Sequence, residues 1–253
     1  MAKAGRQGVR ASVWLEGGGR PGGRRGGQPS GLDRERITEV TVRLLDAEGL
    51  AKFSMRRLAA ELNVTAMSVY WYVDTKDELL ELALDAVFGE LRRPDPEAAE
   101  DWRVQLRTLA RENRRLLVRH PWLSQLVGTY LNIGPHSLAF SRAVQGVMRR
   151  SGLPAHRLAS AIAAVFQFVY GYGTIEGHFL ARAADTGLSP DEYFQDSMSA
   201  VAESPDTAPD VIAESRAIMS ARGGDTVAEM LDRDFEFALD LLVAGIEAMV
   251  ERG

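Results

Sequence analysis

Helical periodicity runs through this sequence from residue 33 almost to its end. Apolar residues recur three and four positions apart, and residues that cap helix N-termini precede these runs. Ile37, Val40 and Leu44 follow Asp33 in this way, and Thr75 with Glu78 forms a capping box. Strict alternation of apolar and polar residues is never long enough to demand a β-sheet. The sequence therefore predicts an all-α protein.

Four helices are predicted between residues 32 and 93. Gly49 is expected to end the first, and Asn63, which tolerates a left-handed turn, follows the second. Pro94 and Pro96 break the chain after the fourth, so we place a domain boundary between 93 and 94. The four predicted caps are Asp33, Ser54, Thr65 and Thr75.

Residues 94–253 are predicted to form a second helical domain. Apolar stripes indicate helices from about Trp102 to Arg119 and, further on, near 122–132, 137–151 and 157–183. Ser189 can cap a short helix, and the rest of 184–224 is expected to be a mobile connection. A last helix begins at a Thr226/Glu229 capping box. Its apolar stripe covers more than half its circumference and therefore needs cover on two sides.

Composition excludes several classes of protein. The 253 residues suit one or two domains, and the absence of cysteine excludes disulfide frameworks, iron–sulfur clusters and thiol nucleophiles. No apolar run approaches the ~18 residues of a membrane-spanning helix, and the N-terminus lacks a secretory core. We therefore expect a cytoplasmic protein with no membrane partner.

The first 31 residues differ from the rest of the chain. They carry a net charge of +5 in a chain of net charge −5, and ten of them are glycine. Such a stretch cannot bury enough apolar surface to order itself, so residues 1–31 are predicted to be a disordered tail. Gly17, Gly19 and Gly22 match G-x-G-x-x-G, but no helix can open after them, which argues against a dinucleotide site. A basic arm that touches DNA remains an alternative.

The second and third predicted helices form a helix-turn-helix. An αα-hairpin used only for packing is the plainer interpretation. Tyr70, Trp71 and Tyr72 argue against it, because a row of large aromatic residues on so short a helix requires a partner. Arg56 and Lys76 flank this helix, where contacts to phosphates would fix its register on DNA.

These residues resemble the TetR family of bacterial transcriptional regulators. The match runs from Leu32 to Leu91, above all in FSMRRLAAELNVTAMSVYWYVDTKDELL from Phe53 to Leu80. RHPWL and FVYGYGTIEG, further along the chain, resemble the tetracycline-repressor-like effector domain. The resemblance implies a DNA-binding domain at 32–93, an effector and dimerisation domain at 94–253, and a repressor released from a palindromic operator by a small molecule.

By this resemblance the third helix enters the major groove of double-stranded DNA. Ala66 and Met67 stand where the tetracycline repressor has glutamine and proline, so apolar contacts to thymine and shape readout should gain weight. The implied DNA-binding residues are Arg56, Thr65, Ala66, Met67, Ser68, Tyr70, Trp71, Tyr72 and Lys76.

The same resemblance implies a homodimer, formed by the last helix and the helix near 157–182, and an effector site in each chain. No cofactor or metal is expected. Tyr130 stands where tetracycline repressors use a histidine for the magnesium–drug complex, so a different effector is expected. The candidate lining residues are aromatic or polar and lie within apolar stretches: Tyr130, Asn132, His136, Phe140, Phe166, Tyr170 and Glu176.

The sequence also bears on two rival functions. An enzyme would need a motif such as H-E-x-x-H, G-x-S-x-G or a P-loop, and the sequence contains none of them. A nonspecific nucleic-acid-binding protein would depend on the basic tail, so deletion of residues 1–31 would abolish its binding. The regulator hypothesis predicts only a modest loss from that deletion.

Overall fold

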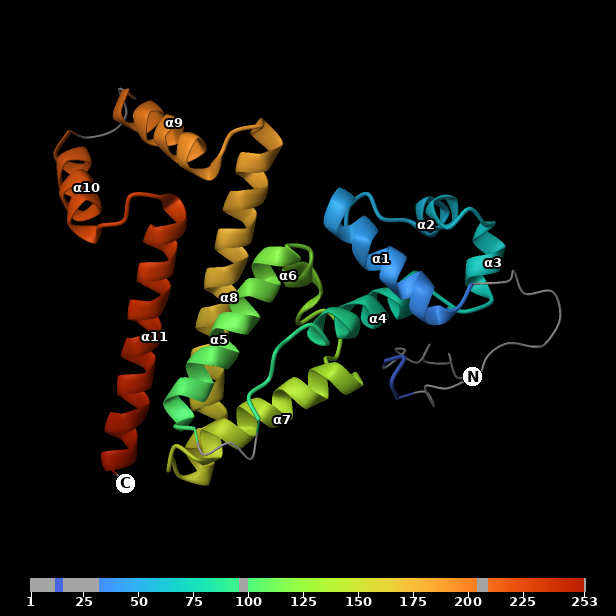
Figure 1. Ribbon diagram of the computed structural model, residues 1–253, viewed down its shortest axis with the longest axis horizontal. Helices are drawn as coiled ribbons and strands as arrows, with labels where there is room; N and C mark the ends of the chain where they lie inside the picture. Colours follow the sequence, from blue (N-terminus) through green and yellow to red (C-terminus); the bar gives the residue numbers. More distant parts are fainter. Residues whose placement is uncertain (1–11, 16–31, 96–99, 204–208, 253) are drawn as a thin grey trace, which may run out of the picture. The chain divides into compact units, whose positions relative to one another are not determined.

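The computed structural model describes residues 12–15, 32–95, 100–203 and 209–252 (Figure 1). The described residues form α-helices and no β-strand, which confirms the all-α prediction. The chain divides into two compact units, one of residues 1–98 and 119–146, the other of 99–118 and 147–253. Residues 119–146 thus group with the N-terminal helices, although they follow the predicted boundary at 93/94 in sequence.

The N-terminal unit contains the four helices that the sequence predicts. Each begins directly after its predicted cap, whose side chain accepts the backbone N–H three residues later. Ile37, Leu58, Val69 and Leu79 are fully buried and supply the core between them. The helices are α1 (Arg34–Glu48), α2 (Met55–Glu61), α3 (Ala66–Tyr70) and α4 (Lys76–Phe88).

The segment after residue 119 contains less helix than predicted. A helix was expected near 122–132, but α6 covers only Leu123–Leu126. Val127 is extended and Gly128 has a φ of 86°, so the backbone leaves the helical region at that point. α7 (Pro135–Arg149) then starts in the N-terminal unit and contributes its last three residues to the other unit.

The second unit consists mainly of long helices. α5 lies close to α8 because Gly173 and Gly177 present no side chain toward the backbone of α5 near Leu117. Phe235 of α11 is fully buried and stacks on Phe168 of α8. The helices are α5 (Trp102–Arg119), α8 (Ala155–Thr186), α9 (Pro190–Glu203), α10 (Pro209–Arg222) and α11 (Val227–Glu251).

The expectation of a mobile connection across 184–224 is wrong, because α9 and α10 occupy most of it. Ser189 caps α9 as predicted, and the Glu192 carboxylate accepts the Ser189 N–H in return. Tyr193 then packs its ring edge-on against Phe179 of α8, and Asp191 accepts the N–H of Val227 at the start of α11. These contacts join residues far apart in sequence, so composition alone could not indicate them.

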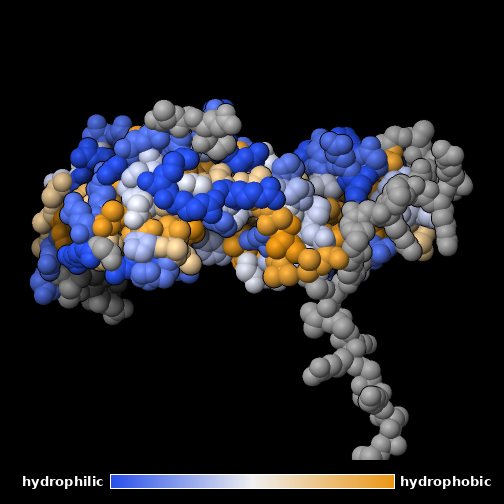
Figure 2. All heavy atoms as spheres, turned by 90° about the horizontal axis from the view of Figure 1, so that it is seen from below, coloured by the Kyte–Doolittle hydropathy of each residue, from blue (hydrophilic) through white to orange (hydrophobic). Residues whose placement is uncertain are grey.

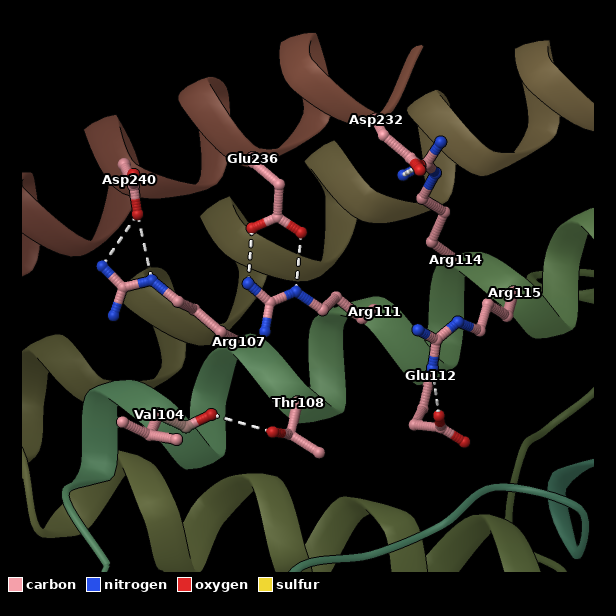
Figure 3. A network of polar contacts seen from close by, with 10 residues as sticks. All are labelled: Val104, Arg107, Thr108, Arg111, Glu112, Arg114, Arg115, Asp232, Glu236 and Asp240. Atoms are coloured by element: carbon pink, nitrogen blue, oxygen red, sulfur yellow. Dashed lines mark hydrogen bonds and ion pairs between the residues drawn. The ribbon is translucent and has the colours of Figure 1, made fainter. Parts of the chain in front are cut away.

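A row of arginines on α5 pairs with acidic residues on α11 (Figure 3). Successive arginines on one face of α5 form ion pairs with successive carboxylates on the facing side of α11. These ion pairs connect the two helices along their length. The pairs are Arg103 with Glu247, Arg107 with Asp240, Arg111 with Glu236, and Arg114 with Asp232.

Apolar surface remains exposed on the second unit. Ile175 of α8 and Phe237 and Leu241 of α11 are largely exposed. Figure 2 shows one face of the molecule, on which hydrophobic patches interrupt the hydrophilic surface. α8 is also long and apolar enough, by composition, to cross a membrane, a test that core helices of soluble proteins pass as well.

Candidate nucleic-acid interface and effector region

The turn between α2 and α3 sets the direction of α3 relative to α2. Asn63 adopts a left-handed conformation, with φ 54°, and the Val64 N–H donates to the Ala59 carbonyl at 2.9 Å. Val69 then anchors α3 to the core. Because this short helix buries so little of itself, its opposite face stays open to solvent.

That open face of α3 is apolar and aromatic. Met67 is 68% exposed, Tyr70 43% and Trp71 60%. The exposure of these large apolar side chains has no role in the packing of the N-terminal unit, which favours a binding surface. The hydroxyls of Thr65 and Ser68 already make hydrogen bonds at the start of the helix. The Thr65 hydroxyl accepts the Ser68 N–H and is hydrogen-bonded to the Ser68 hydroxyl. The surface offered to a partner is therefore more suited to apolar contact than to a dense set of side-chain hydrogen bonds.

Adjacent arginines on α2 have different environments. Arg57 is held by Glu48 and Glu61, and the hydrogen bonds that it donates to those carboxylates raise the pKa of its guanidinium. Arg56 is exposed on the same helix. Only Arg56 of this pair matches a predicted DNA contact. The ion pairs of Arg57 give it a structural role within the N-terminal unit instead.

Lys76 and Tyr72 flank α3 on its C-terminal side. The Lys76 ammonium donates to the Phe53 carbonyl at 3.0 Å and lies 5.5 Å from the Phe53 ring centre, which ties the start of α4 to the chain before α2. The Tyr72 hydroxyl is buried and has no hydrogen-bond partner among the described residues. Lys76 therefore has a structural contact that the sequence did not reveal, beside its predicted role at a phosphate.

A buried histidine joins three parts of the N-terminal unit. His120 Nδ1 lies 2.6 Å from Asp46 Oδ1 at the end of α1, and its Nε2 lies 3.2 Å from Glu90 Oε2 after α4. Trp122 Nε1–H donates to the same Asp46 oxygen. Burial opposes the charged imidazolium, but the hydrogen bonds and charges of Asp46 and Glu90 outweigh it and raise the pKa of His120.

Four of the predicted effector residues lie in the N-terminal unit. The Tyr130 hydroxyl donates to Asp77 at 2.9 Å, and burial together with that carboxylate raises the pKa of Tyr130 to about 12. Phe140 packs on Phe88, with ring centres 6.0 Å apart. His136 is exposed at the start of α7. The amide oxygen of Asn132 is buried and has no hydrogen-bond partner in the described part of the chain.

The other three effector candidates lie on α8 in the second unit. Phe166 and Tyr170 are half-buried. Glu176 is engaged by Arg114, which donates to both of its carboxylate oxygens at 2.5 and 2.8 Å. Arg114 itself lies over the ring of Phe235, 4.6 Å from its centre. The sequence analysis missed Arg114, although a charged residue among the apolar positions of α5 was an available signal.

No group of three or more His, Asp or Glu residues that could hold a metal ion occurs among the described residues. The candidate DNA-binding residues thus form an exposed apolar face beside basic residues on α2 to α4, and the candidate effector residues are divided between the two units.

Known families match both regions of the chain. Residues 37–83 match "Bacterial regulatory proteins, tetR family", and residues 94–250 match "Tetracyclin repressor-like, C-terminal domain". The HTH-type transcriptional repressor DrrR1 of Streptomyces coeruleorubidus is 34% identical over 89% of this chain and 81% of its own length. An HTH-type transcriptional regulator of Saccharopolyspora erythraea is 41% identical, over 55% of this chain and 59% of its own length.

Solved structures share the fold. ActR of Streptomyces coelicolor in complex with actinorhodin superposes with a TM-score of 0.68 at 26% identity, over 87% of this chain and 97% of that one. BioQ bound to its double-stranded DNA operator superposes with a TM-score of 0.56 at 24% identity, over 86% and 99%, which supports the fold alone.

The homologues are transcriptional regulators, and regulators of this kind are soluble proteins that bind DNA operators as homodimers and respond to small molecules. The match across 94–250 covers more than half of the chain. This protein belongs to the TetR family and is a ligand-responsive DNA-binding transcriptional regulator.

Proposed function

We propose that this regulator is a cytoplasmic repressor without catalytic activity, which holds a palindromic operator as a homodimer and is released by a small molecule. Residues 32–93 form its DNA-binding domain and 94–253 its effector and dimerisation domain. The names of the relatives support repression, and the actinorhodin complex of ActR supports a small-molecule effector. The first 31 residues, apart from 12–15, lie outside the described residues and stay a predicted tail.

The exposed face of α3 is the observation that carries the proposal. Met67, Tyr70 and Trp71 place apolar surface where a recognition helix meets the major groove, and this surface can contact thymine methyl groups. Arg56 lies beside it on α2, where a guanidinium can donate to guanine O6 and N7. A phosphate contact from Lys76 would fix the register of the helix on DNA.

Release requires two states of the dimer. In the DNA-binding state the two α3 helices lie about one DNA turn apart, roughly 34 Å. In the effector-bound state α4 swings and this spacing is lost. The effector must favour the second state by a coupling free energy of typically about 1–3 kcal/mol.

Fluorescence anisotropy on DNA flanking the protein's own gene, against scrambled DNA, tests the proposal. Arg56→Ala should weaken specific binding by about 5- to 150-fold, since a base contact contributes about 1–3 kcal/mol. Trp71→Ala should also weaken binding while the dimer stays intact. Arg36→Ala is the matched control, because Arg36 is an exposed arginine on α1 whose guanidinium pairs with Glu39 on the same helix. Unchanged affinity in both test variants would remove α2 and α3 as the DNA-binding elements.

A further inference from the structure

α4 carries three buried carboxylates, and each is held by a different part of the N-terminal unit. Glu78 accepts the Asp74 N–H at 2.7 Å and pairs with Arg34 of α1. Glu81 accepts the hydroxyl of Ser12 and, at 3.2 Å, the N–H of Val13. Asp85, one turn further on, reaches the start of α7 and is only 3% exposed. Polar contacts on several sides therefore fix the position of α4.

Asp85 makes the contact that a helix cap normally makes. Its Oδ1 accepts the Ser137 N–H at 2.8 Å and its Oδ2 accepts the His136 N–H at 3.2 Å. Leu138 N–H donates to the Gly134 carbonyl at 2.9 Å, which makes Gly134 the N-cap residue of α7. His136 and Ser137 are thus the second and third residues of the helix, whose amides an N-cap side chain ordinarily satisfies.

Gly134 has no side chain with which to cap α7, and the structure leaves no room for one. A Cβ on Gly134 would collide with Cγ and Oδ1 of Asp85 and would lie 2.8 Å from its Cβ. The carboxylate of α4 therefore occupies the space of the missing cap side chain. Its negative charge also lies at the positive end of the α7 dipole in a buried setting, where such a charge interacts most strongly.

From this geometry we infer that Asp85 is a positioning residue that makes α4 follow the first turn of α7. The inference builds on the proposed swing of α4. α7 is one continuous helix whose last residues, Val147–Arg149, belong to the second unit. A movement of α7 is passed to α4 because the amides of His136 and Ser137 cannot leave the Asp85 carboxylate without losing their hydrogen bonds, and the Ser137 amide is buried away from water.

A purely structural cap is the competing interpretation, and a pair of variants separates the two. Asp85→Ala removes both the cap and the connection to α4, and should lower Tm by about 2–4 °C for a typical loss of one cap. Asp85→Gly/Gly134→Ser removes the Cβ of residue 85 together with its carboxylate, which makes room for a side chain at 134, and gives α7 a local cap but no connection to α4. This double variant should therefore have a higher Tm than Asp85→Gly alone, without regaining the coupling.

The coupling can be measured without DNA or effector. The chain contains no cysteine, so Ala60→Cys on the exposed surface of α2 gives one spin label per protomer in the full-length homodimer. Pulsed electron–electron double resonance then measures the distribution of distances between the two labels, and thus between the two DNA-binding domains. Glu247→Ala is the control, because it breaks an ion pair with Arg103 in the second unit and leaves α4 and α7 untouched.

We expect a broader distance distribution than in the wild type for Asp85→Ala and for the double variant, and an unchanged one for Glu247→Ala. If either Asp85 variant is folded, as judged by circular dichroism, and shows the wild-type distance distribution, the positioning role is overturned and Asp85 is a cap only. Because the readout contains no DNA, this result is independent of whether the anisotropy test supports operator binding.

Discussion

Replacement of Arg114 by methionine should destabilise the protein far more than the same change at Arg107. Both arginines lie on the same face of α5 and both pair with a carboxylate on α11 (Figure 3). They differ in burial, because the Arg114 side chain is 9% exposed and its second partner Glu176 11%, whereas Arg107 is 25% exposed and Asp240 61%.

The expected magnitudes follow from that difference. Arg114→Met leaves the Glu176 carboxylate buried without its cation, and breaking a buried pair from one side costs about 3–5 kcal/mol. Burial opposes the charge of Arg114, but the hydrogen bonds and charges of Glu176 and Asp232 together outweigh burial and raise the pKa of the guanidinium. Arg107→Met removes a pair that water screens and should cost at most about 1 kcal/mol.

Urea unfolding of the homodimer at one fixed protomer concentration measures both variants, since dimer stability depends on concentration. The double variant Arg114→Met/Glu176→Leu should recover most of the loss, because a buried ion pair and an apolar pair of similar size are close in free energy. Equal losses at Arg114 and Arg107, or no recovery in the double variant, would refute the argument from burial.

Three further predictions concern the core, a titrating contact and a helix cap. Phe235→Ala should cost about 3–5 kcal/mol in urea unfolding, because the ring is fully buried; a loss below about 1 kcal/mol would contradict that packing. His120→Gln should lower the free energy of unfolding, relative to the wild type, most below about pH 6.5. The pKa of His120 is raised in the folded state, so its stabilising contribution is complete below its unfolded pKa and is lost as pH rises through the folded pKa. A loss that instead grows toward alkaline pH would contradict the contacts with Asp46 and Glu90. Thr226→Ala should lower Tm by about 2–4 °C in a thermal scan, through loss of the α11 cap, and an unchanged Tm would count against the cap.

The sequence by itself determined where most helices begin and which short helix is exposed. Ser54, Thr65 and Thr75 each bond to an amide three residues later, so their effect is local and visible in the order of residues. The aromatic residues of α3 were likewise recognisable, because so short a helix can bury only one side, and Val69 already occupies it.

Only the tertiary structure decided the contacts between distant residues. Glu176 could be proposed as a polar residue near an effector, but its pairing with Arg114 joins residues 62 apart. Asp85 caps a helix 51 or more residues away, and the glycine at the cap position of α7 gives no sign of a partner. The full length of α9 was missed for the same reason, since contacts such as that of Phe179 with Tyr193 hold it. Local hydrogen bonds can be predicted from spacing, whereas a buried charge takes whichever partner the packing of the helices brings to it.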